Sequence, residues 1–171
     1  MTKKKFSQIF IEKKIRQKSF GVLSTVSPKG WAQSTGVLYG VSDPSVELKL
    51  YILTGRDYKK TQNILSNPQV SFVITYPHYY FRFAPASTIQ FQAKAKILPV
   101  TNQFALQSFK KKRVLRMTID WTDDDDEKDQ YVFLELKPIK RYNCYGVGYS
   151  FIELARNAED ASYKVEIGQN Q

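Results

Sequence analysis

The sequence predicts a mainly β protein of the α+β class, built around an antiparallel barrel. Runs rich in β-forming residues recur at similar lengths, and several alternate apolar with polar residues, as strands with one solvated face do. Most connections between the runs are too short for the crossovers of a parallel sheet. The five or six strands therefore favour an antiparallel barrel over a doubly wound sheet. The predicted strands cover residues 20–26, 31–41, 47–54, 70–76, 87–98 and 131–136, the last continuing over 139–145 after a kink at Pro138.

Two short helices are predicted in the first half of the chain. Isoleucines with helical spacing follow Ser7, which is a suitable N-cap for a helix over residues 7–18. A second helical pattern begins at Asp57, the expected N-cap, and ends at Asn67-Pro68, because the residue before a proline disfavours helical geometry.

The second half of the chain contains a third predicted helix, over residues 101–117, which begins at a Thr101 cap. Residues 120–129 then carry seven acids in ten positions and are expected to form a solvated surface loop. No element is predicted with any clarity in the C-terminal tail, about 149–171. We expect a single domain over residues 1–171, since this length and a hydrophobic content of 42% suit one core.

The net charge of +10 is unevenly distributed along the chain. Residues 1–119 hold 20 bases and 4 acids, a net charge of +16, whereas residues 120–171 hold 6 bases and 12 acids, a net charge of −6. A strongly basic segment predicts an anionic partner. Composition alone leaves nucleic acid, an anionic membrane and a phosphorylated small molecule open.

The cysteine count and the N-terminal residues indicate the compartment and exclude some kinds of site. Cys144 is the single cysteine, so an internal disulfide is excluded and a zinc site is disfavoured. The N-terminal residues have neither the apolar core of a signal peptide nor the length of a membrane span. We therefore expect a cytoplasmic protein with no metal site and no membrane segment.

The strongest local feature is the strand-to-helix junction LYILTGRDYKKTQNILSNP. Thr54, Arg56, Tyr58, Lys59 and Lys60 gather where a helix presents unpaired N–H groups and the positive end of its dipole. Two lysines in a first turn are unfavourable unless an anion binds there. The junction predicts a phosphate site, and a merely solvated basic face is the alternative.

These residues resemble a known family, the flavin-binding split-barrel proteins related to pyridoxamine 5′-phosphate oxidase, over roughly residues 8–100. The segments that carry the resemblance are GVLSTVSPKGWAQSTGVLYGV, LYILTGRDYKKTQNILSNPQVSFVI and IQFQAKAKIL. In that family a threonine ends the third strand, Ser-Arg-Lys opens the helix at the FMN phosphate, and Asn-Pro ends it. A later strand carries a small residue, any residue and Ala. The matching residues are Thr54, Tyr58-Lys59-Lys60, Asn67-Pro68 and Ala93-Lys94-Ala95.

The resemblance implies a six-stranded antiparallel Greek-key split barrel with short flanking helices, which forms a homodimer with FMN at its interface. It further implies an oxidoreductase whose small-molecule substrate and catalytic residues are unknown. The phosphate would lie at Thr54, Tyr58, Lys59 and Lys60. The flavin ring would follow Ser34, Thr35, Gly36, Val37 and Leu38, and Thr88 matches a position where the oxidases carry a flavin-contacting glutamine.

Some of the family's residues are replaced here. Thr35 and Gly40 stand where the true oxidases have an Arg and a Lys, and KRYNCYGVGYSFIELARN offers no match to their substrate-binding arginines. A general FMN-binding reductase therefore fits better than vitamin B6 oxidation.

Two alternatives stay open. A deazaflavin-dependent reductase would use the same barrel and phosphate corner. A nucleic-acid-binding barrel is suggested by the basic and aromatic residues 78–83, but consecutive aromatic residues in a strand point to both faces, which disfavours a stacking platform.

Overall fold

The computed structural model describes residues 5–77, 86–119, 128–156 and 159–168. Predicted features at residues 78–83 and 120–127, including His78, lie outside these ranges. Eight strands are described: β1 (Phe20–Val26), β2 (Ala32–Leu38), β3 (Gly40–Val41), β4 (Leu50–Gly55), β5 (Gln69–Tyr76), β6 (Ser87–Pro99), β7 (Tyr131–Tyr145) and β8 (Ser162–Glu166). The helices are α1 (Gln8–Arg16), α2 (Lys59–Ser66), α3 (Gln103–Lys110), α4 (Arg113–Ile119) and α5 (Phe151–Arg156), with 3-10 turns η2 (Lys128–Gln130) and η3 (Glu159–Ala161).

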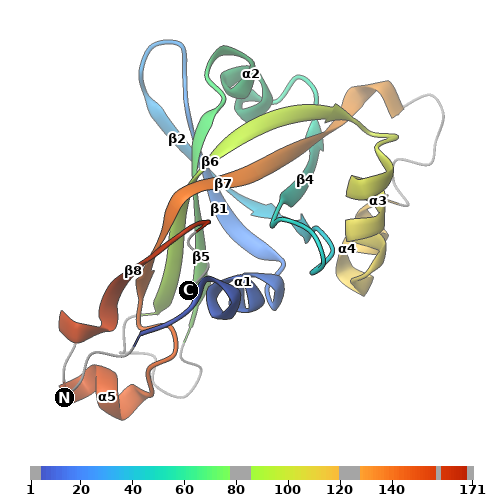
Figure 1. Ribbon diagram of the computed structural model, residues 1–171. Helices are drawn as coiled ribbons and strands as arrows, with labels where there is room; N and C mark the ends of the chain where they lie inside the picture. The colour runs from blue at the N-terminus through green and yellow to red at the C-terminus, as the bar shows by residue number, and fades with distance from the viewer. Residues whose placement is uncertain (1–4, 78–85, 120–127, 157–158, 169–171) are drawn as a thin grey trace.

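The strands form one antiparallel sheet in the order β2-β1-β5-β6-β7-β4-β3, with β8 paired to β7. The sheet curls into the barrel seen in Figure 1. The prediction of a mainly β antiparallel split barrel is confirmed. The prediction of six strands is wrong, because the described residues contain eight.

One of the two additional strands arises where the chain turns the corner of the barrel. Residues 31–41 were predicted as one strand, but β2 pairs with β1 whereas Gly40 pairs with Tyr51 of β4. The chain therefore steps between the two ends of the sheet at Tyr39, whose ring is fully buried. A Cβ atom at Gly40 would overlap Ser108 and Phe109 of α3, so this close approach requires glycine.

The other additional strand, β8, lies in the C-terminal tail. It pairs with β7 from Arg141↔Glu166 to Tyr145↔Ser162. β7 itself continues through Pro138, and a register shift opposite Phe91/Gln92 absorbs the kink, with Lys140 at a φ of 62°. A bulge of this kind lets a strand bend without ending, which explains why the kink does not divide β7.

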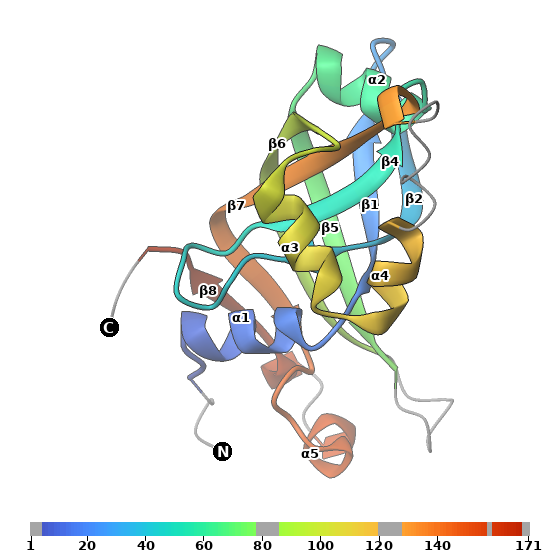
Figure 2. The ribbon, with the colours of Figure 1, turned by 90° about the vertical axis from the view of Figure 1, so that its right-hand side faces the viewer.

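Two helices close opposite ends of the barrel, α1 below and α2 above in both views (Figures 1 and 2). The predicted N-cap of α1 is confirmed, since Ser7 Oγ accepts a hydrogen bond from the Phe10 N–H at 3.2 Å. The predicted N-cap of α2 is wrong. The helix begins at Lys59 with Tyr58 as N-cap, and Asp57 lies one residue outside.

The predicted helix over residues 101–117 is two helices, α3 and α4, and its N-cap is Asn102 rather than Thr101. The break between them lies at residues 111–112, inside the Lys110–Arg113 charge run. Lys112 turns away from both helices and donates hydrogen bonds to the carbonyls of Arg16 (3.0 Å) and Lys18 (2.6 Å).

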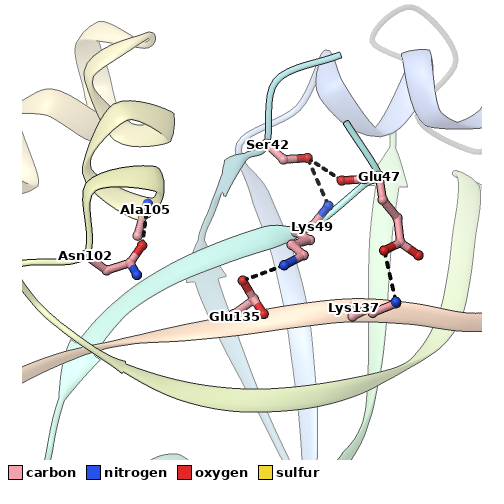
Figure 3. A network of polar contacts seen from close by, with 7 residues as sticks. All are labelled: Ser42, Glu47, Lys49, Asn102, Ala105, Glu135 and Lys137. Atoms are coloured by element: carbon pink, nitrogen blue, oxygen red, sulfur yellow. Dashed lines mark hydrogen bonds and ion pairs between the residues drawn. The ribbon is translucent and has the colours of Figure 1, made fainter. Parts of the chain in front are cut away.

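Polar contacts between β7 and the segment that precedes β4 fix this side of the barrel (Figure 3). Lys49 pairs with Glu135 at 3.1 Å, and Lys137 pairs with Glu47 at 2.9 Å. In the described ranges, no helix has both the length and the apolar character needed to cross a bilayer.

Candidate functional site

A cavity of about 250 Å³ lies where β2, β4, α2, α3, α4 and β7 meet. β2 and β4 form its walls from opposite ends of the sheet, and α2 begins directly after β4. The cavity thus lies at the corner where the barrel closes, a position that brings together segments far apart in the sequence. Among the described residues that line it, Lys60 is the one cationic side chain and none is acidic.

Six of the ten residues predicted to bind a cofactor line this cavity: Gly36, Val37, Leu38, Thr54, Tyr58 and Lys60. They come from two predicted groups, one on the second strand and one at the strand-to-helix junction. The structure brings the two groups together through the fold, since β2 and β4 are not hydrogen-bonded neighbours in the sheet.

The other four predicted residues do not line the cavity. Ser34 lies on β2, where its hydroxyl is 2.8 Å from that of Ser24, and Thr35 is exposed on the same strand. Lys59 is exposed at the first position of α2. Thr88 lies near the start of β6, paired with Thr75 and Tyr145, whereas β6 pairs with the cavity's end of β7 through Pro99↔Val132.

Thr54 gives the cavity an unused polar group. Its side chain is buried, at 5% exposure, and its hydroxyl oxygen has no hydrogen-bond partner within the described ranges. A buried hydroxyl without a partner costs free energy, on the order of 1–3 kcal/mol. A ligand with a polar group in the cavity would remove that cost.

Lys60 supplies positive charge to the lining, and the ring of Tyr58 lies beside it. The Lys60 ammonium nitrogen lies 4.8 Å from the centroid of the Tyr58 ring, within the range of a cation–π contact. Partial burial lowers the pKa of Lys60 below its ordinary value. In the described part of the chain no carboxylate pairs with Lys60, so its charge is available to an anion.

The start of α2 adds backbone donors next to this amine. Tyr58 makes no side-chain capping hydrogen bond, and the first turn contains no acid. The early N–H groups of a helix otherwise need an acceptor from a cap, water or a ligand. An anion at this position would meet the N–H groups, the helix dipole and the Lys60 charge together.

Sequence reasoning missed the cavity residues contributed by later elements: Phe109 of α3, Thr118 of α4 and Tyr131 of β7. Tyr131 pairs in the sheet with Gly55, the residue that follows the predicted Thr54. That pairing is a long-range contact with no local sequence signal. The hydrophobic pattern around Phe109 predicts that it is buried, but the same pattern is found for core residues and does not identify a cavity.

The sequence profile described as "Pyridoxamine 5'-phosphate oxidase" matches residues 9–145, which is most of the chain and includes all the cavity residues named above. The chain belongs to the pyridoxamine 5′-phosphate oxidase family. The family resemblance inferred from the sequence is thereby confirmed. A search of curated proteins gave no match.

Solved structures show the same fold as this pyridoxamine 5′-phosphate oxidase family member. Campylobacter jejuni ChuZ matches with a TM-score of 0.67 at 15% identity, over 96% of this chain and 62% of that one. A heme binding protein from Mycobacterium smegmatis gives 0.63 at 13% identity, over 85% and 57%. HutZ, the heme storage protein of Vibrio cholerae, gives 0.53 at 19%, over 74% and 86%.

Proposed function

We propose that this chain binds FMN in the cavity and acts as an FMN-dependent oxidoreductase on a small-molecule substrate. The phosphate would bind at Tyr58, Lys59 and Lys60, and the flavin ring would lie along β2, over residues 34–38. The observation that carries the proposal is one cavity that contains a buried hydroxyl, on Thr54, and an amine, on Lys60, neither of which has a hydrogen-bond or ion-pair partner among the residues that the structure describes.

The chemistry of the lining fits the two ends of such a cofactor. The basic helix start suits a phosphate dianion, for the electrostatic reasons given above. The β2 side is apolar apart from its backbone, and Gly36 exposes that backbone because it has no side chain. A Cβ at Gly36 would come within 2.8 Å of the Phe20 ring, an exposed side chain, so a larger residue here would displace that ring.

The flavin, when bound, supplies the hydride or electron transfer chemistry. The residues of the chain have simpler tasks. Lys60 and the helix start bind the phosphate, Thr54 offers a hydroxyl to the ligand, and Phe109 and Tyr131 exclude water from the cavity. No acid–base residue has to be assigned for these tasks.

A homodimer forms part of the proposal, and the outer face of β1 and β5 supports it. Val22 and Val73 are directly paired across these strands and only half-buried, beside small polar side chains such as Ser24 and Ser71. An outer sheet face with small polar and half-buried apolar side chains suits contact with a second copy of the chain. Size-exclusion chromatography with light scattering tests the prediction of a dimer.

The test of the proposed cofactor is a titration of the purified protein with FMN, followed by quenching of flavin fluorescence and by visible absorption. Deazaflavin and heme are tested in parallel, since two structural neighbours are named for heme. Saturable FMN binding that is weakened in a Lys60→Ala variant is the expected result. The assignment would be overturned if deazaflavin or heme bound more tightly than FMN, or if the Lys60→Ala variant bound FMN as tightly as the parent protein.

A further inference from the structure

One buried side chain connects the two halves of the proposed site. Asn63 lies on α2 one turn after Lys60 and is 4% exposed. Its amide nitrogen donates hydrogen bonds to Thr25 Oγ1 and to Gln33 Oε1, each at 2.9 Å. Thr25 and Gln33 are register partners across β1 and β2, so the amide bridges a helix and two strands.

The bridge joins two elements that both contribute residues to the cavity lining. On α2, residues three apart lie on the same side of the helix, so Asn63 and Lys60 point in similar directions. On β2, Gln33 precedes the cavity residues Gly36 and Val37 on the same strand. The hydrogen bond from Asn63 to Gln33 therefore links the element that carries the cation to the strand that forms the opposite wall.

Both linked elements have few other anchors. α2 has eight residues, and its buried side chains are Thr61, Asn63 and Ile64, so a single apolar residue secures it to the core. β2 is at one end of the strand order, and among the described strands it pairs with β1 alone. A leucine at position 63 would bury apolar surface but would make no directional contact. The asparagine amide donates both of its N–H groups to fixed partners, and these two hydrogen bonds set the rotation and the position of the helix.

We propose that Asn63 is a positioning residue that holds the start of α2 at a fixed distance from β2, and thereby makes the site selective for a flavin that carries a terminal phosphate. This inference rests on the proposed function. Asn63 itself does not contact the ligand in this proposal. Its consequence is that loss of the bridge weakens the phosphate contacts and leaves the ring contacts on β2 largely intact.

The test compares the dissociation constants for FMN and for riboflavin, which has the same ring and lacks the phosphate. The ratio of the two constants isolates the phosphate contribution from general loss of stability. We expect Asn63→Leu to weaken FMN binding about tenfold, equivalent to about 1.4 kcal/mol, and to change riboflavin binding less than about twofold.

A matched control is Ser42→Ala. Ser42 is another buried hydrogen-bonding residue, 8% exposed, which donates to the Glu47 carbonyl at 2.9 Å and accepts from the Lys49 N–H at 3.0 Å (Figure 3). It does not line the cavity. We expect this variant to lower the thermal midpoint and to leave the FMN-to-riboflavin ratio unchanged.

The outcomes separate this inference from the proposed function. If the parent protein binds FMN no more tightly than riboflavin, the phosphate site is wrong and the inference fails with it. If the parent prefers FMN and Asn63→Leu keeps that preference, only the inference is overturned. Should Asn63→Leu not fold, Gln33→Ala decides the question, because it removes the β2 end of the bridge and leaves the Thr25 bond; an unchanged ratio again overturns the inference.

Discussion

The ammonium group of Lys60 lies over the ring of Tyr58, 4.8 Å from its centroid, and the ring in turn packs on Gly55. A Cβ atom at Gly55 would lie 2.8 Å from that ring. The ring and the ammonium group thus stack above the last residue of β4. In the described part of the lining, the Tyr58 ring thus orients the cation Lys60 with no carboxylate beside it that would compete with an anionic ligand.

Tyr58 is expected to matter through its ring rather than its hydroxyl. Replacing it with phenylalanine keeps the face that contacts Lys60, whereas leucine removes it. A partly exposed cation–π contact contributes about 0.5–1 kcal/mol, so Tyr58→Leu should weaken FMN binding roughly two- to fivefold. Fluorescence titration measures this effect. Equal loss in Tyr58→Phe would indicate that the hydroxyl is the important group.

Binding of FMN should weaken as the pH rises through the pKa of Lys60. Partial burial lowers that pKa, so the protonated amine that attracts phosphate is lost at a lower pH than for an ordinary lysine, whose pKa is about 10.4. The measurement is the FMN dissociation constant across the alkaline range, with riboflavin as the reference for ionisation of the ring. A Lys60→Met variant should bind FMN more weakly and without this pH dependence. An identical pH profile in the variant would exclude Lys60 as the titrating group.

Thr54 and Thr61 provide a matched pair of buried hydroxyls. Thr54→Val removes an unpartnered hydroxyl, so the free energy of unfolding of the ligand-free protein should stay the same or rise. FMN affinity should fall about three- to tenfold, the usual range for one hydrogen bond. Thr61→Val removes a hydrogen bond of 2.8 Å to the Gly55 carbonyl and should lower the free energy of unfolding by about 1 kcal/mol. Urea denaturation compares the two, and a stability loss in Thr54→Val equal to that in Thr61→Val would argue against an unused hydroxyl.

Much of the proposed site follows from local sequence, because its charged part is a single junction. Thr54, Tyr58 and Lys60 lie within seven consecutive residues, and a strand that runs directly into a helix fixes their relative positions. The position of the helix start was less predictable. Asp57 has a good capping side chain, yet α2 begins one residue later, with Tyr58 in the cap position.

The remaining features depend on contacts between distant segments. Phe109, Thr118 and Tyr131 enter the cavity only because α3, α4 and β7 pack beside β4. In the sequence, Asn63 has no feature that distinguishes it from other polar helical residues. Its role depends on the hydrogen bond of 2.9 Å from its amide nitrogen to Gln33 Oε1, thirty positions earlier in the chain. The short strand β3 likewise depends on its pairing with β4, since two residues give no recognisable alternation.

Buried phenols and the thiol predict that the protein loses stability in alkaline solution. Burial raises the pKa of Tyr51 and of Cys144 to about 12, and it also raises the pKa of Tyr39 well above the ordinary value of 10.0. The folded chain keeps these protons while the unfolded chain releases them above pH 9 to 10. The free energy of unfolding should therefore be constant below about pH 9 and decrease as the pH rises further, by about 1.4 kcal/mol per pH unit for each such group.

Urea denaturation between pH 7 and pH 11 measures this decrease, and Tyr39→Phe identifies one contributor. The variant loses the hydrogen bond of 2.8 Å from the Tyr39 hydroxyl to the Ile15 carbonyl, so it should be less stable at pH 7 by about 1 kcal/mol. It also has no phenol to ionise when unfolded, so its stability should fall less steeply above pH 10. The difference between parent and variant should consequently shrink as the pH rises. A constant difference across the whole range would mean that the Tyr39 phenol ionises equally readily in the folded and unfolded chains, contrary to its full burial beneath α1.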